Sequence, residues 1–280
     1  MLICCALLCF SLLDTSAKWL SPTIGAIETA WTRYAVSVVL VSFVLNPWVS
    51  PGVTKTKRPV LQIVRSMMLL ASTVLNFMAL KSLPLMEVLS VMFSTPLLVA
   101  LLSGPILGEW AGPRRLAAIF VGFAGVLVVT RPGVAAFHPA ILFSVAGAFA
   151  YAFYSILTRI LSHHDSSSTT MFYSGLAGML FLTPAIPSIW IAPPSWLVVL
   201  LMLAVGFLGA FGHWLLILAH RHAPASTLAP FIYTQMVYAI ILGYFVFDNL
   251  PDGWTIVGSA IVIASGLYLL HRERVRGIRP

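Results

Sequence analysis

The sequence has few charged residues. Only 9% of its 280 residues are Asp, Glu, Lys or Arg, whereas ordinary soluble domains carry about 25%. Apolar residues make up 60% of the chain. A water-soluble fold of this size cannot bury that much apolar surface, so the solvent of this chain is lipid. The apolar runs extend along the whole chain, which excludes a separate soluble domain.

Cysteine is scarce as well. The three cysteines, Cys4, Cys5 and Cys9, all lie in the first apolar run, which predicts buried thiols and excludes a disulfide framework or a metal site. That run lacks a basic start and is followed by Asp14 and Lys18, so it predicts a retained transmembrane helix rather than a cleaved signal peptide. No cofactor is expected.

The net charge of +8 needs a partner of opposite sign. In a chain this apolar, basic loops facing anionic lipid account for it, so the lipid bilayer and not nucleic acid is the expected partner.

The chain divides into apolar runs separated by Pro, Gly and charged residues. A spanning helix needs about 20 apolar residues, and only helices satisfy every backbone amide inside a single segment. The sequence therefore predicts an all-α polytopic membrane protein with ten transmembrane helices. The expected spans are 1–20, 26–46, 62–80, 84–106, 113–131, 138–161, 169–187, 195–219, 226–247 and 253–271.

Lys and Arg distribute unevenly over the two sides of these spans. With the N-terminus inside, the inner side receives 12 of the 16 basic residues, the outer side receives Lys18, Lys81 and Arg131, and Arg33 lies within a span. The positive-inside rule then places both termini in the cytoplasm.

Two short segments resemble each other at half the chain length. "ALKSLPLM" begins at Ala79 and "AHRHAPAS" begins at Ala219, 140 positions later. The same offset relates Ser94 to Thr234 and Phe93 to Tyr233. Because each half holds five spans, the two halves enter the membrane in opposite senses. The prediction is two inverted five-helix repeats, residues 1–139 and 140–280, a construction typical of alternating-access transporters.

Polar residues inside the spans repeat at helical spacing and predict a shared cavity, because intramembrane polar groups normally face the bundle interior or a water-filled path. The expected substrate-cavity residues are Ser11, Thr73, Asn76, Ser90, Ser94, Tyr151, Tyr154, His213, Tyr233, Thr234 and Tyr238. The alternatives stay open at this point: a Ser or Thr often bonds the carbonyl one turn back, and His213, Tyr151 and Tyr154 suit ordinary packing as well.

Charged residues concentrate in the outer half of the first repeat. Those expected to form gating ion pairs are Asp14, Lys18, Glu28, Arg33 and Glu87. A charge at this depth must pair or reach the interface. An outer gate, with Asp14 and Arg33 as its central pair, and interfacial anchoring of helix ends are the two interpretations.

The fifth and tenth spans, 113–131 and 253–271, carry small residues and no polar stripe. Small residues allow helices to pack backbone to backbone. These spans are expected away from the cavity, as internal support or as the interface of a homodimer.

The order of motifs resembles the drug/metabolite transporter superfamily, EamA type. The matching pieces are "SAKWL" closing the first span, "TRY" at Thr32, the segment "ALKSLPLMEVLSVMFSTPLLVALLSGPILGEW" and the glycine-rich "FVGFAGVLVV". The second half departs from the pattern, because Met236 and Asn249 stand where Pro96 and Glu109 stand in the first half.

The resemblance implies a transporter of small molecules in the bacterial inner membrane. Export of amino acids, aromatic ones included, is the expected activity, and a multidrug or other metabolite exporter is the alternative. An integral membrane enzyme is the alternative from another class, but the sequence holds no His-Glu-x-x-His and no Gly-x-Ser-x-Gly motif.

Overall fold

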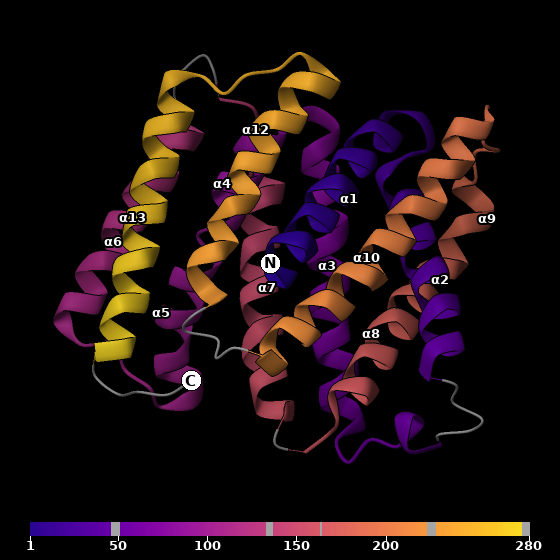
Figure 1. The fold of residues 1–280 in the computed structure, drawn as a ribbon, viewed down its shortest axis with the longest axis horizontal. Helices are drawn as coiled ribbons and strands as arrows, with labels where there is room; N and C mark the ends of the chain where they lie inside the picture. The colour runs from indigo at the N-terminus through magenta and orange to yellow at the C-terminus, as the bar shows by residue number, and fades with distance from the viewer. Residues whose placement is uncertain (46–50, 133–136, 163, 223–227, 276–280) are drawn as a thin grey trace.

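The chain forms a bundle of long helices. The structure is a computed structural model that describes residues 1–45, 51–132, 137–162, 164–222 and 228–275 (Figure 1). The elements of the first half are α1 (Leu2–Ile24), α2 (Ala26–Leu45), η1 (Pro51–Thr54), α3 (Pro59–Ser82), α4 (Leu85–Met92), α5 (Thr95–Leu107) and α6 (Pro113–Thr130). Those of the second half are α7 (Ile141–Ser162), α8 (Ser167–Leu182), η2 (Thr183–Ala185), α9 (Ile186–Ile189), α10 (Trp196–His222), η3 (Ala229–Tyr233), α12 (Thr234–Phe247) and α13 (Gly253–Val275).

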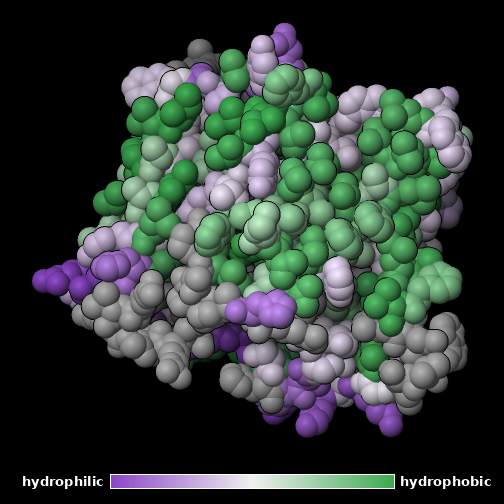
Figure 2. Space-filling view, viewed as in Figure 1, coloured by the Kyte–Doolittle hydropathy of each residue, from purple (hydrophilic) through white to green (hydrophobic). Residues whose placement is uncertain are grey.

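The predicted fold class is confirmed. The described residues contain nine helical segments that are long and apolar enough to span a membrane, and the remaining expected span is a shorter apolar helix, Phe231–Phe247. The surface is apolar across its middle and polar at both ends (Figure 2). We call the end that carries Lys55, Lys57, Arg114 and Arg159 the basic face, and the end that carries Lys81 and Arg131 the opposite face.

The expected span 84–106 is interrupted, which the sequence analysis did not predict. It forms two helices, α4 and α5, because Pro96 has no N–H to donate to the carbonyl of Met92. The Thr95 hydroxyl donates to the Met92 carbonyl instead, at 2.6 Å, and the Ser94 hydroxyl donates to the carbonyl of Val91 at 2.7 Å. Neutral hydroxyls thus satisfy the carbonyls that the break exposes.

The second half has a break at the matching position. Helix α12 starts at Thr234, directly after η3, and the Thr234 hydroxyl donates to the carbonyl of Phe231 at 2.7 Å. Ser94 and Thr234 make the same bond 140 positions apart. The rings that precede them, Phe93 and Tyr233, pack against each other with centroids 5.6 Å apart. The two breaks therefore meet inside the bundle.

Helix packing follows the same two-fold pattern. Helix α1 packs against α10, and its counterpart α7 packs against α3; likewise α2 packs against α10, and α8 against α3. Helices α6 and α13 pack against each other at one side of the molecule (Figure 1). Each of these contacts joins one half to the other, so neither five-helix half buries its apolar faces alone.

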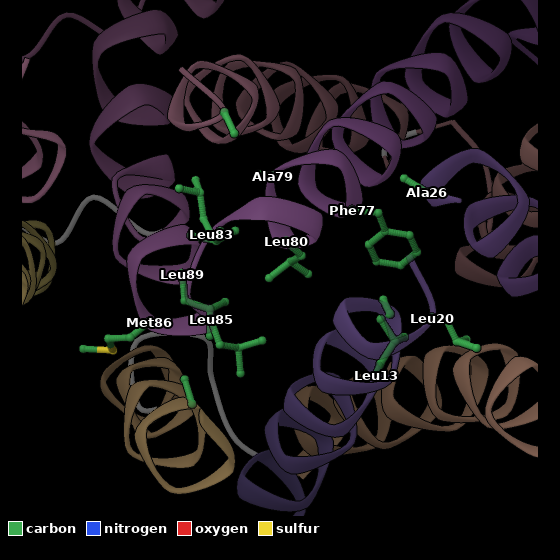
Figure 3. Packing of buried hydrophobic residues seen from close by; sticks show 14 of the residues in the cluster. Leu13, Leu20, Ala26, Phe77, Ala79, Leu80, Leu83, Leu85, Met86 and Leu89 are labelled. Atoms are coloured by element: carbon green, nitrogen blue, oxygen red, sulfur yellow. The ribbon is translucent and has the colours of Figure 1, made fainter. Parts of the chain in front are cut away.

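The largest apolar cluster occupies one half of the bundle along its axis. Its members include Leu20 of α1, Phe77 and Leu80 of α3 and Leu85 of α4, all almost fully buried (Figure 3). These residues stand near the helix ends that reach the opposite face. We call this part of the bundle the closed half.

Glycines allow α6 and α13 to approach closely. A Cβ on Gly125 would lie 2.9 Å from the carbonyl oxygen of Gly258, and a Cβ on Gly258 would lie 2.7 Å from the carbonyl oxygen of Gly125. The small residues of the fifth and tenth spans are thus used within one chain, which matches the expectation of internal support. A homodimer through these helices stays a prediction, and the small faces do not favour it because they are already buried against each other.

This contact gives a stability prediction. Gly258→Ala adds a Cβ against backbone atoms that cannot move aside, and we expect it to lower the free energy of unfolding by about 1–3 kcal/mol. Gly253→Ala is the matched control, because nothing lies within 4 Å of a Cβ at Gly253. Thermal unfolding in detergent compares the two variants. An equal melting temperature for both would mean that α6 and α13 do not pack as described.

Candidate functional site

A cavity of about 290 Å³ lies in the half of the bundle near the basic face. Its walls come from α2, α3, α7, α8 and α10, and it extends from the α7–α8 connection to the middle of α2 and α10. Its polar lining residues are Arg33, Tyr34, Ser37, Arg65, Tyr154, Thr158, Ser162, Asp165, Ser167, Thr170, Ser174 and His213. The cavity, with its arginines and hydroxyls among apolar side chains, and the apolar closed half thus lie toward the two ends of one bundle.

The cavity exists because one set of repeat-related contacts is missing. In the closed half, α3 packs against α1 and α2. The equivalent contacts of the second half would join α10 to α7 and α8. Within the described residues, α10 makes no comparable packing with either helix. The bundle is therefore sealed toward the opposite face and parted toward the basic face.

Arg65 forms the wall on α3. Its side chain is 1% exposed, although it is one of the 12 basic residues expected on the inner side. Nη1 and Nη2 donate to the Ser174 hydroxyl at 2.9 and 2.6 Å, and Nη2 also donates to the carbonyl of Thr170 at 3.2 Å. The guanidinium carbon lies 4.9 Å from the centroid of the Tyr154 ring. Its partners in the described residues are neutral, and Nε has none.

Arg33 lies deeper, on α2. Its Nη1 donates to the Thr73 hydroxyl at 2.7 Å, and the same hydroxyl is 2.8 Å from the Tyr34 hydroxyl. The guanidinium carbon is 5.3 Å from the centroid of the Tyr34 ring. A Cβ on Gly209 of α10 would lie 3.4 Å from Arg33 Nε. Gly209 thus leaves the space in which this guanidinium sits.

The expected ion pair between Asp14 and Arg33 is absent from this structure. Asn76 Nδ2 donates to Asp14 Oδ1 at 3.3 Å, while Arg33 bonds Thr73 one turn earlier on α3. The described residues form ion pairs elsewhere, Arg131–Asp252 at 2.6 Å and Arg159–Glu109 at 2.7 Å. Asp14 and Arg33 thus each bond a neutral side chain of α3, Asn76 and Thr73 respectively, and not each other.

The other expected gate residues lie toward the opposite face. Lys18 Nζ donates to the carbonyl of Leu80 at 3.1 Å and sits 5.3 Å from the Phe247 ring centroid, so it ties α1 to the end of α3 and to α12. Glu28 is fully buried and accepts a bond from the Ile191 amide at 3.0 Å. Glu87 is half-buried in the first turn of α4. Their role as a gate stays a prediction.

Asp165, in the connection between α7 and α8, lines the mouth of the cavity. Its carboxylate accepts hydrogen bonds from the Lys57 amide at 2.9 Å, from Gln62 Nε2 at 3.0 Å and from the Thr56 hydroxyl. Burial acts to raise the pKa of Asp165, but these hydrogen bonds outweigh it and hold that pKa below its usual value. The α7–α8 connection is thereby fastened to the start of α3.

The expected cavity residues fall into three groups. Tyr154 and His213 line the cavity. Thr73 bonds Arg33, and Tyr151 packs on Tyr154 with ring centroids 5.3 Å apart. Asn76 bonds Asp14, and the Ser11 hydroxyl is buried without a partner among the described residues. The last group does not line the cavity: Ser90, Ser94, Tyr233, Thr234 and Tyr238.

Those remaining residues have other neighbours. Ser90 bonds Ser259 of α13 at 2.6 Å, and Tyr238 packs on the cluster of Ile3, Leu7, Ala219 and Leu228. Ser94 lines a separate apolar pocket of about 300 Å³ between α4, α5, α6 and α7. Ser90 and Ser94 therefore lie outside this cavity, and their contact with a substrate stays a prediction.

Nine polar residues of the lining were not among the expected cavity or gate residues: Tyr34, Ser37, Arg65, Thr158, Ser162, Asp165, Ser167, Thr170 and Ser174. Arg65 carried a usable signal, since it lies a full turn inside an apolar helix. The Ser and Thr positions carried none, because hydroxyls are common in membrane helices.

Comparison with known proteins supports a transporter. The model of the EamA-like transporter family matches residues 1–131 and 138–271. An S-adenosylmethionine uptake transporter of Rickettsia prowazekii is 28% identical over 94% of this chain and 89% of its own. A riboflavin transporter of Vibrio cholerae is 28% identical over 97% of this chain and 92% of its own.

A solved crystal structure has the same fold. It covers 99% of this chain and 99% of its own, with a TM-score of 0.66 at 18% identity. The family names and the relatives point to transport of small metabolites across a membrane, not to an enzyme. With nearly the whole length matched by the family model, the chain belongs to the EamA-like transporter family.

Proposed function

We propose that this protein carries a small metabolite across the bacterial inner membrane by alternating access, and that the cavity between α10 and the α7–α8 pair is its substrate site. The observation that carries the proposal is the broken symmetry of the packing. Helix α3 packs against α1 and α2, but α10 does not pack comparably against α7 and α8 within the described residues. A bundle built from two equivalent halves has adopted one of two equivalent arrangements.

In the second arrangement, α3 and α10 exchange roles. Closing α10 onto α7 and α8 would seal the basic face, and parting α3 from α1 and α2 would open the opposite face. A substrate bound in the middle would then meet the other side of the membrane. Because the two arrangements bury similar contacts, a modest free-energy difference separates them, and substrate binding can shift the populations.

The relatives favour import. The Rickettsia protein is named as an uptake transporter for S-adenosylmethionine, and the Vibrio protein as a transporter for riboflavin. Neither name supports the expected export of amino acids. S-adenosylmethionine and riboflavin both combine a planar ring system with polar groups. Tyr34, Tyr154 and Phe172 are among the residues that line the cavity, together with hydroxyl-bearing residues and two arginines.

Sidedness is the first test. The positive-inside rule makes the basic face cytoplasmic, so the cavity of this structure faces the cytoplasm. In a variant with Cys4, Cys5 and Cys9 replaced, a cysteine at Lys57 should react with an impermeant thiol reagent only after the inner membrane is opened. A cysteine at Lys81, exposed on the opposite face, should react in intact spheroplasts. The reverse pattern would invert the orientation.

Transport through the cavity is the second test. Uptake of labelled S-adenosylmethionine, riboflavin and amino acids into proteoliposomes identifies the substrate. Ala210→Trp fills the cavity from α10 and should abolish that flux, while the protein stays folded. Phe211→Trp is the matched control, because Phe211 stacks with Phe207 and Trp214 on the exposed side of α10.

Normal flux in the Ala210→Trp variant would place the substrate path elsewhere. Loss of flux in both variants, with both proteins folded, would show that the effect comes from α10 as a whole and not from the cavity.

A further inference from the structure

We propose that the cavity selects substrates that carry a carboxylate, and that Arg33 and Arg65 bind this group. The inference rests on the proposed function and adds the substrate class. Both guanidinium groups line the same cavity, yet neither forms an ion pair with a described acidic residue.

Of the two arginines, Arg65 lacks an acidic partner most plainly. A buried charge is costly unless an opposite charge and hydrogen bonds compensate it. Arg65 is 1% exposed, and its hydrogen-bond partners among the described residues are a hydroxyl and a backbone carbonyl. Its Nε is buried and has no partner in the described structure. Arg65 thus places an uncompensated charge behind the cavity wall, and Arg33, which is partly exposed, places a second one at the cavity surface.

The acids that stand nearest to this cavity are already engaged. Asp165 lines the mouth, but its carboxylate accepts bonds from Thr56, Lys57 and Gln62. Asp14 accepts from Asn76. A carboxylate brought by the substrate would therefore supply the missing negative charge, rather than displace a resident acid.

The geometry prepares the two bases for an incoming anion. Arg33 is held by Thr73, and Arg65 by Ser174, so each guanidinium is fixed before the substrate arrives. Each also lies near a tyrosine ring, Tyr34 for Arg33 and Tyr154 for Arg65. Neutral holders fix the direction of the donors without cancelling the charge. This is how a preorganised site gains affinity for a carboxylate.

The test compares ligands that differ in one group. Inhibition of labelled S-adenosylmethionine uptake is measured with unlabelled S-adenosylmethionine, its decarboxylated form and S-adenosylhomocysteine, which keeps the carboxylate but lacks the sulfonium charge. Adenosine monophosphate tests whether a phosphate replaces the carboxylate. We expect the decarboxylated form to inhibit about 10- to 100-fold more weakly than the two carboxylates, the usual loss for a charge-assisted hydrogen bond.

The variants assign the effect to the cavity. Arg65→Gln should remove the discrimination between S-adenosylmethionine and its decarboxylated form, and Arg65→Lys should keep part of it. Arg159→Gln is the control, because Arg159 pairs with Glu109 outside the cavity lining. If Arg65→Gln does not fold, Arg65→Lys and Arg33→Lys carry the comparison, with a reduced discrimination expected in each.

The experiment distinguishes failure of carboxylate selection from failure of the proposed function. Equal inhibition with and without the carboxylate, or flux of riboflavin alone, overturns carboxylate selection and leaves transport intact. Stronger inhibition by adenosine monophosphate than by the two carboxylates would show that the arginines bind a phosphate, and this would also overturn carboxylate selection. Absence of flux for every compound in the panel would overturn the proposed function, and this inference with it.

Discussion

Hydrocarbon offers no hydrogen bonds, and every polar group inside the bundle must therefore find its partner in the protein. Most intramembrane hydroxyls of this chain meet that constraint locally: Thr15, Ser21 and Thr158 each donate to the carbonyl one turn back. Charged groups find their partners on other helices, as Lys18 does on the Leu80 carbonyl. At the cavity near the basic face, Arg33 and Arg65 form no ion pair with a described acidic residue.

The two-fold repeat explains both the stability of the bundle and its openness. Contacts between the halves, such as α1 with α10 and α3 with α7, bury the apolar faces in a symmetric manner. The two helix breaks, at Ser94 and Thr234, lie at equivalent positions and bring Phe93 and Tyr233 together. Within the described residues, the contacts of α3 with α1 and α2 have no comparable counterpart at α10, the third helix of the second half, and the contact between α1 and α2 has none between α7 and α8. The closed half and the cavity lie on the two sides of this asymmetry.

The sequence predicts the spans and the repeat well, because both depend on local patterns. Apolar length defines the helices, and the offset between Phe93 and Tyr233 corresponds to a real contact. The cavity is predicted less well. A polar stripe identifies a face of a helix but not the helix that covers it, so Ser90 was expected at the cavity and instead bonds Ser259. Arg65 was counted among the inner-side basic residues although it lies inside the expected span 62–80, and α3, which begins already at Pro59, buries it within the bundle.

The sequence also leaves the packing asymmetry undetermined. Both arrangements of an inverted repeat use the same residues, so no pattern along the chain says which side is open. The expected Asp14–Arg33 pair illustrates this: Asp14 is bonded by Asn76 and Arg33 bonds Thr73, both on α3. Only the position of α3 decides whether they meet.

The central claim is that closure of one face is coupled to opening of the other. Spin labels at Ser162 of α7 and His222 of α10 report the basic face, and labels at Ile27 of α2 and Lys81 of α3 report the opposite face; all four side chains are exposed. Pulsed electron-spin distance measurements in lipid nanodiscs, with and without transported substrate, compare the two pairs in a variant without its native cysteines. The account predicts that a shorter Ser162–His222 distance always accompanies a longer Ile27–Lys81 distance. Distances that change together, or a cavity that closes while the opposite face stays sealed in every condition, would contradict it.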